Sequence, residues 1–165
     1  MEKNSSGIYK LSGYDEVEPV EIEAHFEEIK AQIIESIQSA KFSIWVAMAW
    51  FTDNDLGNEL WKKHKEGVNV QVIVNDDDVT KKNGLKFGNY GIEYYPVAPD
   101  SPWGKKIMHN KFCVIDLKKV IHGSYNWTNN AKYNNENITI TDSRELAEEF
   151  AGQFIELKKM AMGSL

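Results

Sequence analysis

The stretch that decides the fold is HNKFCVIDLKKVIHGSYN, residues 109–126. Most of it is apolar, which predicts two β-strands joined by a short turn. Four polar side chains interrupt the apolar pattern: His109, Lys111, Ser124 and Asn126. Strands that face a core do not need such groups. The stretch therefore predicts a polar site built on a pair of strands.

The alternation of side chains along a strand predicts which of these residues meet. His109 and Lys111 share one face of the first strand. A hairpin that turns at Leu117 and Lys118 would place directly opposed residues of the second strand on the same face. The opposed pairs on that face would be His109 with Asn126, Lys111 with Ser124, and Cys113 with His122. A shift of one residue would separate the four polar groups.

The predicted patch suits phosphate chemistry. An imidazole such as His109 can act as a nucleophile or a general acid and base near neutral pH. Lys111, Ser124 and Asn126 can hold phosphate oxygens where negative charge develops. No further carboxylate or histidine has metal-ligand spacing near His109, and the acidic run 75–82 lacks the spacing of a calcium loop. We therefore expect neither a metal nor a cofactor.

Three residues of the stretch have weaker claims to the site. Asp116 has the wrong parity for the face of His109, so we expect it to orient or stabilise rather than attack. Cys113 is predicted to be inert core. His122 would share the face of the patch, but at a deeper position beside Cys113.

Composition limits the class of protein. The chain has 165 residues, a net charge of −6 and one cysteine, which predicts one domain without an intramolecular disulfide. No apolar run approaches the ~20 residues of a membrane span, and the first residues do not resemble a signal peptide. We expect a cytoplasmic protein without stable membrane association.

The order of elements predicts an α/β domain. Residues 22–40 form one apolar stripe of helical period, residues 42–51 and 69–75 read as buried strands, and the strand at 92–98 is expected at an edge because it contains Pro96. Helices alternate with strands and strands then cluster. This predicts a mixed, mostly parallel sheet flanked by helices on both faces. The expected boundaries are an N-terminal arm (1–21), one domain (22–160) and an unstructured tail (161–165).

Two elements of the stretch resemble the signature of the phospholipase D superfamily. HNKFCVID fits H-x-K-x-x-x-x-D, and GSYN fits the G-S-x-N element that follows it. The single copy of the motif and the small size look most like the Nuc-type endonucleases. The resemblance covers about residues 22–160 and implies a phospholipase D/nuclease-like fold.

The resemblance also implies a mechanism and an assembly. Members of this family form a phosphohistidine on one motif histidine, while a second protonates the leaving oxygen and then activates water. This chain has one motif, so the resemblance implies a homodimer with both His109 residues at the two-fold axis. Lys111 would bind the phosphate, and Ser124 and Asn126 would complete the anion cradle. Glu136 matches a family acid that hydrogen-bonds the imidazole, although an exposed strand end would also explain it.

The resemblance implies a phosphodiester substrate, and the features that the sequence has or lacks indicate its class. Small size and the lack of a basic amphipathic helix favour nucleic acid over lipid, with DNA favoured over RNA. Trp103, Lys105 and Lys106 are candidate rim contacts, and Trp50 and Phe51 are further candidates for stacking on bases. A lipid phosphodiesterase of the phospholipase D type and a non-catalytic module that binds nucleic acid or protein remain the alternatives.

Overall fold

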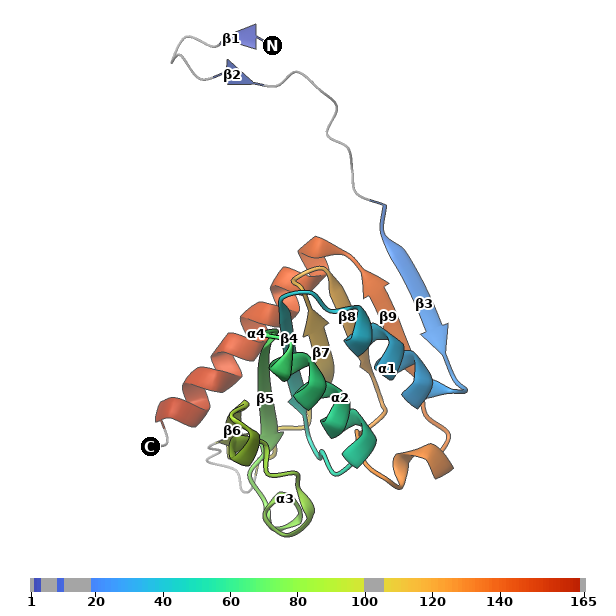
Figure 1. Ribbon diagram of the computed structural model, residues 1–165, viewed down its shortest axis with the longest axis vertical. Coiled ribbons are helices and arrows are strands. Elements are labelled where there is room, and N and C mark those ends of the chain that lie inside the picture. Colours follow the sequence, from blue (N-terminus) through green and yellow to red (C-terminus); the bar gives the residue numbers. More distant parts are fainter. Residues whose placement is uncertain (1, 4–8, 11–18, 100–105, 164–165) are drawn as a thin grey trace.

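The computed structural model describes residues 2–3, 9–10, 19–99 and 106–163. A seven-stranded sheet has the order β3-β9-β8-β7-β4-β5-β6, and β1 pairs with β2 (Figure 1). The strands are β1 (Glu2–Lys3), β2 (Tyr9–Lys10), β3 (Glu21–His25), β4 (Ser43–Met48), β5 (Asn69–Asn75), β6 (Glu93–Val97), β7 (Lys111–Ile115), β8 (Lys119–Gly123) and β9 (Ile138–Asp142). The helices are α1 (Ile29–Ser39), α2 (Asn54–Lys65), α3 (Asp78–Asn83) and α4 (Arg144–Gly163), with 3₁₀ turns η1 (Phe87–Tyr90) and η2 (Ala131–Tyr133).

Helices cover both faces of the seven-stranded sheet. Figure 1 shows α1 and α2 on one face and the long α4 across the other. Ile33 of α1 and Leu60 of α2 pack with Val46 of β4 in one buried cluster. Phe154 of α4 packs with Ala47 in a second cluster on the opposite side of the sheet. The predicted α/β layering is confirmed.

The sheet is mixed, as predicted, but the expectation that it is mostly parallel was wrong. β5 runs parallel to both of its neighbours, β4 and β6, whereas the other four pairings of the sheet, including β4 with β7, are antiparallel. A strand that returns through a tight turn must run antiparallel, and β7 returns into β8 in this way. β6 lies at the edge of the sheet, as Pro96 predicted.

The turn between β7 and β8 begins one residue earlier than the sequence indicated, and three residues (116–118) instead of two separate the paired Ile115 and Lys119. Asp116 and Leu117 both have left-handed backbone angles, with φ of 54° and 49°. The N–H of Lys118 donates to the carbonyl of Ile115 at 3.0 Å. Two successive residues with positive φ are typical of a type I′ turn, whose twist matches that of the strands it joins. The predicted turn centre at Leu117 and Lys118 was therefore wrong.

The earlier turn changes every cross-strand pair. Phe112 lies opposite His122 and Cys113 opposite Ile121, so the predicted pairs of this hairpin are displaced by one residue. His122 consequently lies on the face covered by α4, where its ring stacks on Phe150 with 5.4 Å between centroids. The expectation that His122 shares the face of His109 was wrong, because a shift of one residue moves a side chain to the other face.

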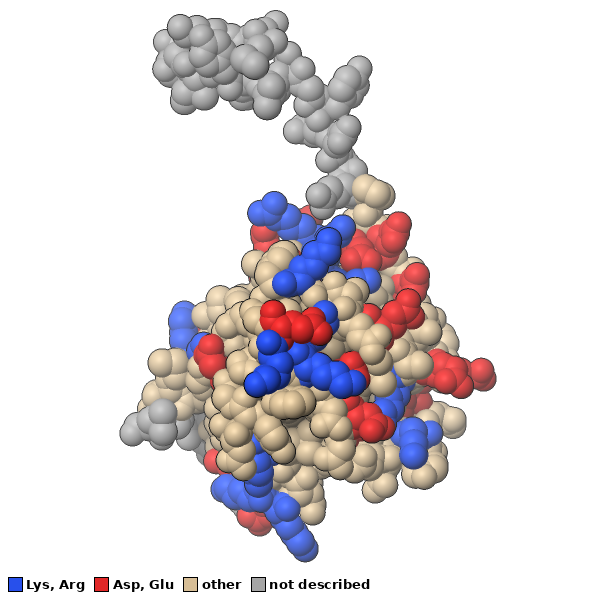
Figure 2. Space-filling view, viewed as in Figure 1, with Lys and Arg blue, Asp and Glu red and all other residues tan. Residues whose placement is uncertain are grey.

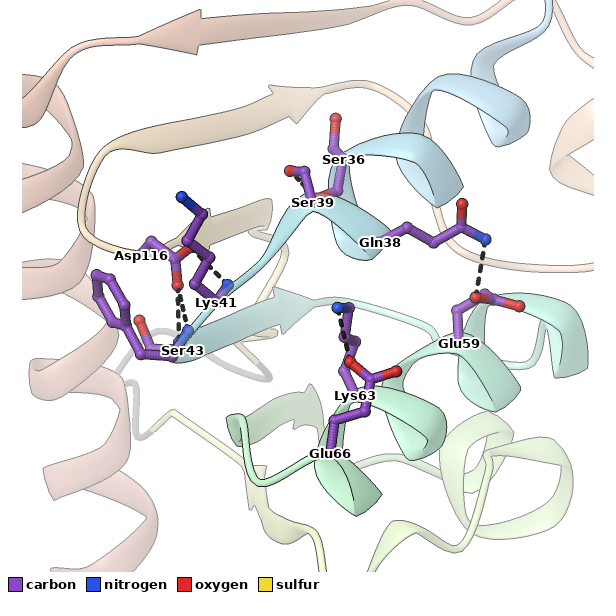
Figure 3. Close-up of polar contacts among 10 residues, drawn as sticks. Ser36, Gln38, Ser39, Lys41, Ser43, Glu59, Lys63, Glu66 and Asp116 are labelled. Carbon is purple, nitrogen blue, oxygen red and sulfur yellow. Dashed lines mark hydrogen bonds and ion pairs between the residues drawn. The ribbon is translucent and has the colours of Figure 1, made fainter.

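Asp116 fixes this turn against the start of β4. Its carboxylate accepts backbone hydrogen bonds from Lys41 at 2.8 Å and from Phe42 and Ser43 at 2.9 Å each (Figure 3). β7 separates this end from the segment that carries His109, and its five residues span about 17 Å. The contacts of Asp116 are therefore structural, as its parity indicated.

The first predicted helix is shorter than expected. Residues 21–25 form β3, which pairs antiparallel with β9 at the edge of the sheet, and the helix begins only at Ile29. Ile22 and Phe26, which extended the apolar stripe of the sequence, are 67% and 71% exposed. The strand forms because β9 offers it an unpaired edge, and this partner is distant in the sequence.

The last helix is longer than expected. α4 continues to Gly163, so residues 161–163 are helical rather than part of an unstructured tail. Ala161 lies on the buried face of α4 and belongs to the second core cluster. Burial of this position stabilises the additional turn.

Candidate active site

His109 lies just before β7, in a segment that is fixed on both sides. The N–H of buried Met108 donates to Oδ1 of Asn75 at 2.9 Å, which ties the segment to the carboxyl end of β5. The carbonyl of Asn110 accepts from the N–H of Ala49 at 2.9 Å, just beyond the end of β4. Between these anchors the side chain of His109 is exposed. The sheet therefore presents a solvent-accessible imidazole on a fixed backbone.

Trp50 supports the imidazole from one side. Its ring meets that of His109 edge-on, at 5.5 Å between centroids and 74° between planes. The indole N–H donates to Asp77 at 2.8 Å, and Asp77 also accepts from Asn75 and from the N–H of Thr80. Burial opposes the charge on Asp77, but these hydrogen bonds outweigh it and lower the pKa of its carboxyl. Asp77 thus caps α3, as the acidic run indicated, and also orients Trp50.

Lys111 contacts His109 directly. Its Nζ lies 3.2 Å from Nε2 of His109 and 3.1 Å from the carbonyl oxygen of the same residue. Lys111 is half-buried, and this burial lowers the pKa of its ammonium, while the charge of Glu136 acts in the opposite direction. His109 and Lys111 of the same chain are therefore in contact, as predicted.

Ser124 and Glu136 form a pair beside β8 and β9. The hydroxyl of Ser124 donates to the carboxylate of Glu136 and accepts from the N–H of Asn137 at 3.1 Å. Gly123 makes this approach possible, because a Cβ there would lie 2.2 Å from the carbonyl oxygen of Asn137. The contact recorded for Glu136 is thus with Ser124, whereas the sequence resemblance implied a contact with an imidazole.

Asn126 faces a neutral trough. The trough has a volume of about 670 Å³, and its walls include Trp50, Thr52, Asn54, Asn126 and Thr128. Among the described residues, Oδ1 of Asn126 is buried without a hydrogen-bond partner, and such an orphaned acceptor is uncommon. We call this groove the amide trough. Trp50 both contacts His109 and lines the trough, so this one side chain lies between the trough and the imidazole.

The loop of Asn126 is held by the segment that follows β4. The carbonyl of Trp127 accepts from the N–H groups of Thr52 and Asp53 at 2.9 and 3.0 Å, and Phe51 forms an isolated bridge with Trp127. These contacts, rather than the hairpin register, hold Asn126 at the wall of the amide trough. The grouping of Asn126 with His109 stays a prediction.

The other predicted residues lie in several places. Asp116 lies at the far end of β7, and His122 on the opposite face of the sheet. Trp103 and Lys105 lie outside the described residues, and Lys106 is exposed. Cys113 is buried, and burial raises the pKa of its thiol, as expected for inert core.

The sequence missed the role of Trp50 as a neighbour of the imidazole. Trp50 was a candidate for stacking on bases, but Trp103 was the better candidate for a rim contact because it is nearer to His109 in the sequence. The position of Trp50 directly after the predicted buried strand was the available indication, since side chains at the ends of such strands commonly line sites in α/β sheets.

Within the described ranges, the histidine, cysteine and acidic side chains form no group of three or more that could hold a metal ion. No helix in the part of the chain that the structure describes is long and apolar enough to cross a bilayer.

Comparisons with known proteins identify the relatives of the chain. Residues 33–158 match the family model described as "Cardiolipin synthase, PLD-like domain". The chain is 32% identical over 131 residues to the mitochondrial cardiolipin hydrolase of Mus musculus, covering 79% of this chain and 58% of the relative. It therefore spans little more than half of that protein. The relative is named as mitochondrial, and the cytoplasmic location expected for this chain stays a prediction.

Two solved structures share the fold. Nuc from Salmonella typhimurium, described as a phospholipase D family member, superposes with a TM-score of 0.75 at 23% identity and covers 86% of this chain and 96% of its own. NucT from Helicobacter pylori gives a TM-score of 0.76 at 22% identity and covers 86% of this chain and 98% of its own. Nearly the whole of both neighbours is matched, so the described sheet and helices share their fold.

Proposed function

Because the chain belongs to the phospholipase D superfamily, we propose that it is a metal-independent phosphodiesterase that cleaves nucleic acid with His109 as nucleophile. The observation that carries this proposal is the exposed imidazole of His109 between the ammonium of Lys111 and the indole of Trp50. An ammonium can only donate, so Nε2 of His109 accepts from it and carries the lone pair that a nucleophile needs.

The proposed reaction has two steps. In the first, Nε2 of His109 attacks phosphorus, an N–P bond forms, and the P–O bond to the leaving group breaks. His109 of a second copy donates its proton to the leaving oxygen. In the second step that imidazole takes a proton from water, the water oxygen attacks phosphorus, and the N–P bond breaks. The products are an alcohol and a phosphomonoester, and both imidazoles return to their starting states.

The neighbouring groups suit the charge that develops on phosphate. Lys111 supplies a positive charge next to the attacking nitrogen. Asn126 also carries an amide N–H₂ group, which can donate to a phosphate oxygen. Donors held in place stabilise a transition state because they need not reorient during the reaction. The hydroxyl of Ser124 donates its one proton to Glu136, so it must exchange this partner before it can donate to phosphate.

The need for two imidazoles supports a homodimer with one shared site. Mixed dimers of wild type and His109→Ala would carry one histidine each and be inactive. An equal mixture, refolded together, should retain about a quarter of the wild-type rate, whereas independent sites would retain about half. A result near half would contradict the shared site.

The decisive experiment measures cleavage of labelled single- and double-stranded DNA and RNA in excess EDTA. His109→Ala should reduce the rate at least about a thousandfold. His25→Ala is the matched control, since His25 lies on edge strand β3 and pairs with Glu23. A rate that EDTA abolishes, or that His109→Ala preserves, would contradict the mechanism.

A lipid phosphodiester is the second candidate substrate, because the mouse relative is named a cardiolipin hydrolase. Hydrolysis of cardiolipin in vesicles, assayed beside the oligonucleotides, separates the two. Cleavage of lipid alone would transfer the mechanism to that substrate. Binding of nucleic acid without any cleavage would favour a non-catalytic module.

A further inference from the structure

A second cavity opens between α2 and the segment that leads from α3 to β6. It has a volume of about 390 Å³, and its lining includes Trp61, Tyr90, Asn58, Asn89 and Lys86. We call it the aromatic pocket. The rings of Trp61 and Tyr90 approach edge-on at 6.3 Å, yet the two residues remain 40% and 58% exposed. An exposed aromatic pair at the rim of a cavity offers ring surface to a ligand.

The aromatic pocket adjoins the amide trough. Asn54 and Leu85 line both cavities. Leu85 reaches this position because Gly57 leaves room for it on α2, where an added Cβ would lie 2.4 Å from Cδ1 of Leu85. The N–H of Leu85 donates to the carbonyl of Phe51, which fixes the shared wall. A path therefore runs from Trp50, next to His109, to Trp61.

The path lacks negative charge in a protein of net charge −6. Among the described residues that line the two cavities there is no aspartate or glutamate, and the one charged residue is Lys86. Other grooves differ: one is lined by four acids, Glu21, Asp142, Glu145 and Glu148, and by two bases, Lys118 and Arg144. Figure 2 shows basic side chains gathered at the α3 end of the molecule and acidic ones on the side of β3 and α1. Such a path suits a polyanion better than the rest of this surface.

We propose that the amide trough and the aromatic pocket together bind a single strand of nucleic acid, with one base stacked on Trp61 and Tyr90. The proposal rests on the proposed function, whose substrate it makes more specific. Stacking on a side chain requires a base that is free of its neighbours in a duplex, so the pocket selects single strands. The side-chain amides of Asn58 and Asn89 can donate to and accept from the edge of the base.

The length of α2 gives the spacing between the amide trough and the aromatic pair. Asn54, at the start of α2, lines the trough, and Trp61 follows seven residues later on the same helix. At 1.5 Å per residue the two are separated by about 10 Å along the axis. This corresponds to about three nucleotides at the ~3.4 Å spacing of a stacked strand, and to fewer in an extended one.

The test measures binding separately from cleavage. The full chain with His109→Ala is titrated into a fluorescein-labelled single-stranded DNA or RNA of about a dozen nucleotides, and anisotropy gives Kd. Adding Trp61→Ala should raise Kd about tenfold, while Trp61→Phe should retain most of the affinity. Phe42→Ala is the matched control, because Phe42 is 57% exposed and lies at the Asp116 end of the sheet. Equal Kd values for all four proteins would overturn the proposal.

An abasic site moved along the oligonucleotide tests the contact with a base. At one position the missing base should cost the same affinity as Trp61→Ala, and the two changes together should cost no more than either alone. Additive losses at every position would show that Trp61 contacts no base. If Trp61→Ala lowers the affinity for cardiolipin vesicles and leaves the binding of oligonucleotides unchanged, the pocket binds lipid. This result would also overturn the proposal.

Hydrolysis of bis(4-nitrophenyl) phosphate keeps the two proposals distinguishable. This small diester reaches His109 without extending to the aromatic pocket. One outcome is that wild type hydrolyses the small diester while Trp61→Ala and the abasic site reduce affinity additively. The phosphodiesterase proposal then stands, and the proposed single-strand site is refuted. The other outcome is that wild type hydrolyses no diester while Trp61→Ala and the abasic site together cost no more affinity than either alone. The single-strand site is then a binding site, and the enzymatic proposal is refuted.

Discussion

Nζ of Lys111 lies 3.2 Å from Nε2 of His109 and 3.1 Å from the carbonyl oxygen of the same residue. One cation thus spans the imidazole and the backbone that carries it. In its protonated form Lys111 donates to Nε2, which leaves the other ring nitrogen with the proton. A bound phosphate would then meet an ammonium and a nitrogen lone pair side by side. The protonation state of Lys111 therefore links substrate binding to the tautomer of His109.

This link predicts the alkaline limit of activity. Burial lowers the pKa of Lys111 below its usual 10.5, so the protonated form is lost at lower pH than for an exposed lysine. The rate constant kcat/KM should fall in that range. In Lys111→Arg the maximal rate should be lower, but the alkaline limb should move to higher pH, because a guanidinium keeps its proton. The measurement is kcat/KM against pH for both proteins, and coincident alkaline limbs would contradict this role.

Gly123 should tolerate no side chain. In Gly123→Ala the new Cβ would meet the carbonyl of Asn137 at 2.2 Å, so β8 and β9 must separate where Ser124 and Glu136 form their pair. We expect a loss of about 2 kcal/mol in the free energy of unfolding, measured by urea titration, and a lower cleavage rate. Gly152→Ala is the control: nothing lies within 4 Å of its Cβ, and alanine in α4 should stabilise by about 0.5–1 kcal/mol. Equal stability of the two variants would refute the argument.

Asp116 should matter for stability and little for the reaction itself. Asp116→Ala removes the acceptor of three backbone N–H groups and places alanine at a positive φ. The expected cost is about 2 kcal/mol of unfolding free energy. Asp116→Asn should recover part of it, since asparagine tolerates this φ and keeps one acceptor oxygen. Activity per folded molecule, at a temperature well below unfolding, should stay near wild type. A large fall in kcat with unchanged stability would instead indicate a role at His109.

The burial of His122 predicts that the free energy of unfolding decreases in acid. Its ring packs on Phe150, and burial lowers its pKa below the usual 6.5. Below about pH 6.5 the unfolded chain therefore binds more protons than the folded one, so the free energy of unfolding falls as pH decreases toward the folded pKa. His122→Phe keeps an aromatic ring on Phe150 and removes the titration. Urea titrations between pH 8 and about 5 should show a smaller decrease for the variant. Parallel curves would contradict the assignment.

The local sequence predicted the elements of the site but not how they meet. Lys111 and His109 share a face because side chains alternate along a strand, and this depends on neighbouring residues alone. The opposition of Lys111 and Ser124 depended on the turn. No Asn-Gly pair marks that turn. Its position is fixed by the backbone N–H groups of residues 41–43, which are remote in sequence and donate hydrogen bonds to the carboxylate of Asp116. The predicted register therefore failed by one residue.

The sequence by itself determined the family, the alternation of helices and strands, the edge position of Pro96 and the two motif residues His109 and Lys111. These follow from local patterns: the period of apolar residues, the conformational limits of proline and the spacing of chemical groups on one strand. Only the tertiary structure decided that residues 21–25 join β9 and that Trp50 supports the imidazole. It also joined the amide trough to the aromatic pocket. Each of these depends on contacts between distant segments, whose free energy exceeds local preference and leaves no trace in any single stretch of sequence.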